Sequence, residues 1–231
     1  SFGFETAVKE AQRVLLAAHS EAHSAWNGIG LVKLMGRQSG FIAAEASLTN
    51  ADVDFCLIPE VPFTMEGAGG FLDALEKRLE RAHHAVVVVA EGAGQTLLEG
   101  PEESGADASG NQKLKDVGVF LKERMQDYLK DKGWSFTIKY IDPSYIIRSL
   151  PADAADSRFC LILGQHAVHA ALSGRTNMMI GHWNNMFTHV PFELATRTRK
   201  KLDPSGETWQ RVLDSTLQPE QLVGKNRELS A

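Results

Sequence analysis

Residues 85–90 read Ala-Val-Val-Val-Val-Ala and lead directly into Glu-Gly-Ala-Gly-Gln at positions 91–95. Consecutive valines favour a β-strand, and a strand that is apolar on both faces is typical of the centre of a parallel sheet. The run is also far too short to span a bilayer as a helix. It therefore predicts a central strand that helices cover on both sides.

Further strands and helices alternate on either side of this run. We expect strands at 28–34, 55–58, 135–141 and 177–182, with one more extended piece ending at Val190 and Pro191. Apolar spacing predicts helices at 4–18, 38–50, 71–82, 112–132 and 152–173, and weaker ones at 192–201 and 207–217. Residues 99–111 are rich in small and acidic residues and predict a surface loop. About five alternations with short connections predict a three-layer α/β/α sandwich with a mostly parallel sheet.

Bulk composition narrows the class of protein. The 231 residues are 43% apolar and 23% charged, which is ordinary for a soluble globular protein. The net charge of -5 argues against nucleic acid as a partner, and no apolar run is long enough for a membrane span. Cys56 and Cys160 both lie in apolar patterns and favour buried thiols in the cytoplasm, with a disulfide as the alternative. Because the chain runs into a helical pattern directly after Ser1, we expect further sequence upstream.

The residues that follow the predicted strands are the first place to look for a ligand site. In open α/β sheets, ligands bind beyond the carboxyl ends of the parallel strands. The candidates there are Met35, Gly36, Arg37, Glu60, Glu91, Asp142, Tyr145 and Arg148. Guanidinium groups match phosphate oxygens and carboxylates accept hydrogen bonds from hydroxyls, so the mixture suits a sugar phosphate. Any α/β sheet places some charges at this edge, so composition alone leaves the ligand open.

Four longer motifs make the interpretation more specific. They read VKLMGR at 32–37 with SGFIA at 39–43, CLIPE at 56–60, VAEGAGQ at 89–95 and YIDPSYIIRS at 140–149. In this order they resemble phosphofructokinases, over nearly the whole chain from Phe2 to about Pro219. Their wording is similar to the branch that contains plant ATP-dependent enzymes and related bacterial forms.

The resemblance implies a role for each motif residue. Met35 and Gly36 would contact the sugar, and the glycine allows the backbone to come close. Arg37 would neutralise charge on the transferred phosphoryl group. Glu91 would accept hydrogen bonds from sugar hydroxyls, and Arg148 would orient the fructose.

Two further residues would lie near the 6-phosphate. The resemblance implies Tyr145 and Lys139 there, with Lys139 offered by a neighbouring subunit of a homo-oligomer. Short bacterial members carry histidine and arginine at these two places, so hydrogen bonding or charge is kept. They also carry an arginine near Gly28, and that cation is missing here.

The donor side of the family's active site is not among the motifs found. The Gly-Gly-Asp and Thr-Ile-Asp-Asn-Asp segments, which hold the donor and the general base, lie upstream of the part matched here. We expect residues 1–149 to bind fructose 6-phosphate and residues 150–231 to pack back toward a donor lobe outside this chain. The resemblance implies phosphoryl transfer from ATP to the 1-hydroxyl of fructose 6-phosphate, with Mg²⁺ accompanying the ATP and no metal site in this chain. Pyrophosphate as the donor, and a non-catalytic phosphofructokinase-like subunit or fragment, remain the alternatives.

Overall fold

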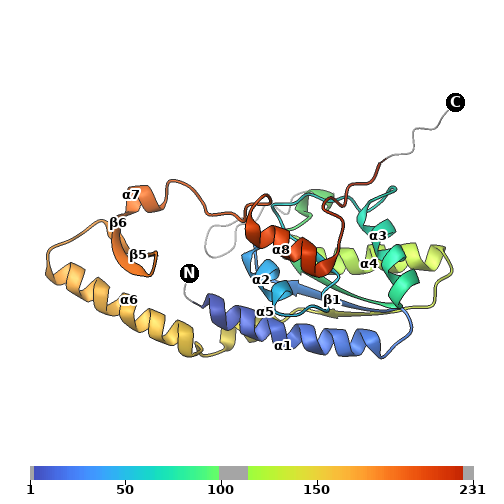
Figure 1. The fold of residues 1–231 in the computed structure, drawn as a ribbon, viewed down its shortest axis with the longest axis horizontal. Coiled ribbons are helices and arrows are strands. Elements are labelled where there is room, and N and C mark those ends of the chain that lie inside the picture. The colour runs from blue at the N-terminus through green and yellow to red at the C-terminus, as the bar shows by residue number, and fades with distance from the viewer. Residues whose placement is uncertain (1–2, 99–113, 226–231) are drawn as a thin grey trace. The chain divides into compact units, whose positions relative to one another are not determined.

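The computed structural model describes residues 3–98 and 114–225, so the loop predicted at 99–111 lies outside the described residues. Contacts between residues divide the chain into two units. The larger comprises residues 8–148 and 201–231, and the smaller comprises residues 1–7 and 149–200. Figure 1 shows the elements of both.

The larger unit is built on a four-stranded parallel sheet. Its strands lie in the order β2 (Phe55–Leu57), β3 (His84–Ala90), β1 (Gly28–Leu34) and β4 (Thr137–Ile141). The valine-rich β3 therefore has a strand on each side, as predicted for a central strand. In the register, Leu34 pairs with Ala90 and Val32 pairs with Ile141, so β1, β3 and β4 end close together.

Helices cover both faces of this sheet, which confirms the predicted α/β/α sandwich. On one face, α3 (Phe71–Ala82) and α4 (Val117–Asp131) pack on the β-strands around a core that includes Leu31, Val87 and Leu121. On the other face lie α1 (Phe4–His23) and α2 (Phe41–Leu48), and α8 (Glu207–Thr216) packs on α2 (Figure 1). The helices and strands predicted in this unit are observed with their ends within five residues of the predicted ones.

Helix α1 approaches the sheet unusually closely at two glycines of β1. A Cβ atom on Gly28 would lie 2.1 Å from the carbonyl oxygen of Ala22, and one on Gly30 would lie 2.9 Å from that of Ala18. Both distances are below van der Waals contact. Small residues on the helix and glycine on the strand are thus a joint requirement of this interface.

The smaller unit contains α6 (Ala154–Leu172), the antiparallel hairpin of β5 (Met178–Trp183) and β6 (Met186–Pro191), and α7 (Phe192–Ala195). The prediction that 177–182 continues the parallel βαβ series was wrong. Asn184 and Asn185, with φ angles of 46° and 63°, form a two-residue turn that reverses the chain. Phe187 of the hairpin packs against Phe159 and His166 of α6, with ring centroids 5.8 Å and 4.9 Å apart.

Several smaller predictions also changed. The weak helix expected at 192–201 ends at Ala195, and residues 144–149 form a short helix, α5 (Ser144–Ser149), after β4. A short 3-10 segment, Gln95–Leu97, follows β3. Cys56 is buried as expected, and burial raises its thiol pKa to about 12, but Cys160 is exposed on α6. In the part of the chain that the structure describes, we find no helix with the length and apolarity needed to cross a bilayer.

Candidate functional site

Two loops are joined by backbone hydrogen bonds just beyond the carboxyl ends of β1 and β3. The amide of Glu91 donates to the carbonyl of Leu34 at 2.9 Å, and the amide of Gly92 donates to the carbonyl of Gly36 at 3.1 Å. The pairing between the two strands thus continues past their ends. It places the Met35–Arg37 turn directly beside the Glu91–Gly92 loop.

Only glycine fits at the centre of each loop. Gly36 has a φ of +148°, and a Cβ there would lie 2.7 Å from the carbonyl oxygen of Ser39. A Cβ on Gly92 would lie 1.9 Å from the carbonyl oxygen of Arg37, far inside van der Waals contact. The two glycines therefore let the backbones of the turn and the loop touch, and this contact fixes the position of Arg37.

The carboxylate of Glu91 faces the same turn. Its Oε1 atom accepts a hydrogen bond from the amide of Gly36 at 3.5 Å, the long limit for such a bond, so most of its acceptor capacity is left for a ligand. The backbone carbonyl of Glu91 is held by Nε2 of Gln95 at 2.8 Å, and the same Nε2 donates to the carbonyl of Lys115 at 3.0 Å. The loop that carries Glu91 is thus anchored on the segment preceding α4.

Helix α5 brings Arg148 to the turn. Its start is set by Asp142, whose Oδ1 accepts from the amide of Ser144 at 3.1 Å and from its hydroxyl. At the other end, Nε of Arg148 lies 3.3 Å from Sδ of Met35. Tyr145 stands three residues before Arg148 on the same helix face, and it is 86% exposed. Both side chains are therefore available to a ligand that lies on the Met35–Arg37 turn.

Lys139 lies apart from this group. It is in the middle of β4 and pairs in register with Gly30, four residues before the end of β1, which is about 13 Å from the sheet edge. Its Nζ atom forms a half-exposed ion pair with Glu21 at 3.2 Å. Of the predicted site residues, the structure thus gathers Met35, Gly36, Arg37, Glu91, Tyr145 and Arg148 at the sheet edge, and does not bring Lys139 to them.

A charged cluster beneath the site was not predicted. Nζ of Lys33 lies 2.9 Å from Oδ2 of Asp116 and 2.9 Å from Oδ2 of Asp142, and the Tyr140 hydroxyl donates to Oδ1 of Asp116 at 3.0 Å. Burial alone would lower the pKa of Lys33, but its hydrogen bonds to Asp116 and Asp142 outweigh burial and raise that pKa above its ordinary value. Burial alone would raise the pKa of both aspartates, but their hydrogen bonds and the Lys33 charge leave each below its ordinary range. The one signal in the sequence was a lysine inside an otherwise apolar strand.

Glu60, a candidate from its place after β2, serves the backbone. Its carboxylate accepts from the amide of Gly40 at 3.1 Å and 3.0 Å, which fixes the start of α2, and from the amide of Leu202 at 2.9 Å. These bonds secure the chain just after the Met35–Arg37 turn. Glu60 therefore stabilises the chain next to the site through backbone hydrogen bonds.

The arrangement combines two guanidinium groups, a carboxylate and a closely approachable backbone turn. Arginine forks bind phosphate oxygens, and a carboxylate with spare acceptor capacity suits hydroxyl groups. Within residues 3–98 and 114–225, no three histidine, cysteine or acidic side chains are grouped so that they could hold a metal ion. The arginine and carboxylate groups equip the site to bind an anionic polyhydroxy ligand.

Comparisons with known proteins identify the family of this chain. The family described as "Phosphofructokinase" matches residues 1–171. The chain is 52% identical over 226 residues to an "ATP-dependent 6-phosphofructokinase" of Borreliella burgdorferi, covering 95% of this chain and 50% of that protein. It is 50% identical over 222 residues to "ATP-dependent 6-phosphofructokinase 1" of Arabidopsis thaliana, covering 95% of this chain and 47% of the relative. The chain thus spans about half the length of the curated relatives it matches.

Solved structures show the same fold. A pyrophosphate-dependent phosphofructokinase from Marinobacter aquaeolei superposes with a TM-score of 0.66 at 17% identity, covering 100% of this chain and 58% of that one. At this identity the likeness concerns the fold alone. The match of the family over most of the chain is the decisive finding, and it shows that this chain belongs to the phosphofructokinase family.

Proposed function

We propose that this chain supplies the fructose 6-phosphate half of the active site of a 6-phosphofructokinase, which transfers a phosphoryl group from ATP to the 1-hydroxyl of the sugar. The proposal rests on one observation: the Met35–Arg37 turn, which requires glycine at position 36, has Glu91 on one side and Arg148 on the other. The names of the relatives, ATP-dependent 6-phosphofructokinases, favour ATP as the donor.

The sugar is bound by groups with complementary chemistry. The backbone at Met35 and Gly36 lies against the sugar, and the Glu91 carboxylate accepts hydrogen bonds from its hydroxyls. Arg148 orients the fructose, and the exposed hydroxyl of Tyr145 reaches the 6-phosphate. These contacts hold the acceptor hydroxyl in place for attack, and such positioning is a large share of catalysis in phosphoryl transfer.

Arg37 acts on the reaction itself in this proposal. Its guanidinium group neutralises negative charge on the phosphoryl group as it moves between donor and acceptor. The contact between Gly92 and the Arg37 backbone supports this role because it fixes where the side chain begins. A preorganised charge of this kind costs no rearrangement during the reaction.

Lys139 contributes from a second copy of the chain in a homo-oligomer. Its ion pair with Glu21 has both side chains about half exposed, at 52% and 51%. Pairs of this kind contribute little stability, so exchanging Glu21 for a phosphate costs little. The distance of Lys139 from its own sheet edge also favours a partner's site over its own.

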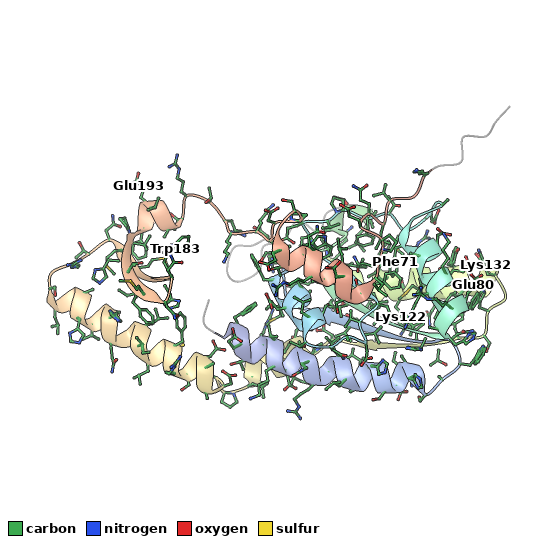
Figure 2. All side chains as sticks on the ribbon, in the orientation of Figure 1. Phe71, Glu80, Lys122, Lys132, Trp183 and Glu193 are labelled. Atoms are coloured by element: carbon green, nitrogen blue, oxygen red, sulfur yellow. The ribbon has the colours of Figure 1, made fainter. Side chains whose placement is uncertain are left out.

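The segment from 150 onward faces a donor-binding region outside this chain. Large apolar side chains of the smaller unit are exposed, with Leu161 at 64%, Val168 at 58%, Leu172 at 81% and Trp183 at 73%. Figure 2 labels Trp183 among them. Of the described residues of α6, only Asp156 and Ala170 are buried. Residues 201–231 group with the larger unit, so we assign the docking surface to residues 149–200.

The donor and its metal belong to that outside region. The described residues do not fit a Mg²⁺ site, so we assign the ion to the complex with ATP and derive no step through it. The general base that accepts the proton of the 1-hydroxyl is assigned to the same region. We also propose a cytoplasmic location, because Cys56 is a buried free thiol of the kind common in reducing compartments.

One set of measurements tests the proposal and its rivals. The intact mass of the native protein shows whether an upstream region accompanies this chain. A coupled assay with fructose 6-phosphate then compares ATP with pyrophosphate, and calorimetry measures sugar binding. We expect turnover with ATP. Turnover with pyrophosphate but not with ATP would identify pyrophosphate as the donor. Sugar binding without turnover in the native protein would favour a non-catalytic subunit. No sugar binding at all would refute the proposal.

A further inference from the structure

We propose that Lys33 is a positioning residue of the sugar site, which holds α5 and its Arg148 in register with the Met35–Arg37 turn. The inference rests on the proposed function and adds a residue to it. Lys33 itself touches no sugar in this proposal. It acts through two carboxylates, Asp142 and Asp116, which belong to different segments of the chain.

The sheet register places Lys33 where it can join these segments. Val32 pairs with Ile141, so the next residue on each strand brings Lys33 level with Asp142. Lys33 is the second-last residue of β1 and lies two residues before Met35, the first residue after the strand. Its side chain is only 11% exposed, and its Nζ atom is 2.9 Å from an oxygen of each aspartate.

Each of these carboxylates also starts a helix. Asp142 accepts from the amide of Ser144 at the first turn of α5, and Asp116 accepts from the amides of Gly118 and Val119 at the first turn of α4. One ammonium group thus connects β1 to the beginnings of two helices. Of these, α5 carries two of the predicted sugar-binding side chains.

Removing the cation would change the forces on α5. The two Oδ2 atoms are each 2.9 Å from one nitrogen, so they lie within about 6 Å of each other, where like charges repel. The repulsion acts at the first turn of α5, and it displaces the helix from β1. Arg148 then moves away from Met35, which its Nε now approaches to 3.3 Å. The expected loss is therefore in sugar binding, and the donor is unaffected.

A second lysine provides a matched control. Lys132, just past the far end of α4, donates to both carboxylate oxygens of Glu76 at 2.8 Å and 2.6 Å. It lies sixteen residues after Asp116, which is about 24 Å along the helix (Figure 2). Replacing it removes a more exposed ion pair at the far end of α4 without touching the sheet edge.

The test uses the full-length native protein with Lys33→Met, Lys33→Arg and Lys132→Met. For Lys33→Met we expect the Michaelis constant and the dissociation constant for fructose 6-phosphate to rise at least about tenfold, with the donor constant unchanged. Lys33→Arg should restore most of the affinity, because a guanidinium can bridge both carboxylates. Lys132→Met should leave the sugar constants unchanged.

Several results would overturn the inference. They are an unchanged sugar constant in Lys33→Met, an equal rise in Lys132→Met, or no recovery in Lys33→Arg. If Lys33→Met does not fold, Asp142→Asn tests the same ion pair, because asparagine can still accept a hydrogen bond from Ser144 but carries no charge. An unchanged sugar constant in Asp142→Asn would also overturn the inference. Absence of sugar binding in the wild-type protein would refute the proposed function itself, which separates the two failures.

Discussion

The contact between Gly92 and the Arg37 backbone allows a quantitative prediction for Gly92→Ala. The added Cβ would lie 1.9 Å from the Arg37 carbonyl oxygen and 2.6 Å from its carbon, whereas ordinary contact begins near 3.4 Å. Both neighbours are backbone atoms, so no side chain can rotate out of the way. The turn and the loop must therefore separate by roughly 1.5 Å.

A displacement of this size acts directly on the proposed chemistry. Misplacing a reacting or charge-stabilising group by about 1 Å can cost a hundredfold in rate. We therefore expect kcat/KM for fructose 6-phosphate to fall at least about 100-fold in the complete enzyme, equivalent to about 2.7 kcal/mol of transition-state stabilisation. The overpacking should also destabilise the fold by about 1–3 kcal/mol.

The assay is steady-state kinetics with a thermal melt on the same samples, and Gly133→Ala is the control. Gly133 has a φ of +72°, and a Cβ added there would meet no atom within 4 Å, so alanine costs about 1 kcal/mol of stability without a clash. Its kinetics should be unchanged. A folded Gly92→Ala protein whose kcat/KM stays within about threefold of the wild type would refute the idea that this turn positions catalytic groups.

Four further outcomes are expected. Arg37→Ala should lower turnover about ten- to a hundredfold, since a charge-assisted contact is worth about 1.5–3 kcal/mol; a raised Michaelis constant with normal turnover would contradict its role. Glu91→Gln should weaken the binding of fructose 6-phosphate measured by calorimetry and leave the donor affinity unchanged. Equal weakening of sugar and donor binding would show that Glu91 does not lie in the sugar site. The 231-residue chain alone should bind the sugar but show no turnover with ATP and magnesium, and robust turnover would show that it contains a general base. The ion pair of Lys33 with Asp142 is fully charged between the ordinary pKa values of 3.8 and 10.5, because the aspartate pKa is lowered and the lysine pKa is raised. The stabilisation from this ion pair is lost only as the pH falls through the lowered pKa of Asp142 or rises through the raised pKa of Lys33. The effect of Lys33→Met on the sugar constants should therefore be the same at about pH 6 and pH 9. A clear difference between the two would count against the role of this ion pair.

Local patterns were sufficient to predict most of the larger unit. The apolar run 85–90 is buried on both faces of the sheet, and a strand of that kind has few alternatives to a central position. The hairpin at 178–191 was mispredicted for a different reason. An extended segment does not encode its partner, and the direction of β5 and β6 depends on the left-handed conformation of Asn184 and Asn185.

The candidate site was predictable where its residues follow strands directly. Met35, Glu91 and Arg148 come together because parallel strands end at one edge, which is a property of the topology. The tie from Lys33 to Asp116 joins residues 83 positions apart, and no periodicity in the sequence indicates such a pair. The role of Lys139 stays a prediction, because it depends on a second copy of the chain.

The close seating of α1 on Gly28 restricts which residues can occupy position 28. At 2.1 Å from the Ala22 carbonyl oxygen, even a methyl group cannot be added to Gly28 without lifting the helix from the sheet. A single substitution therefore cannot introduce a charged side chain at position 28 while α1 keeps its place on the sheet.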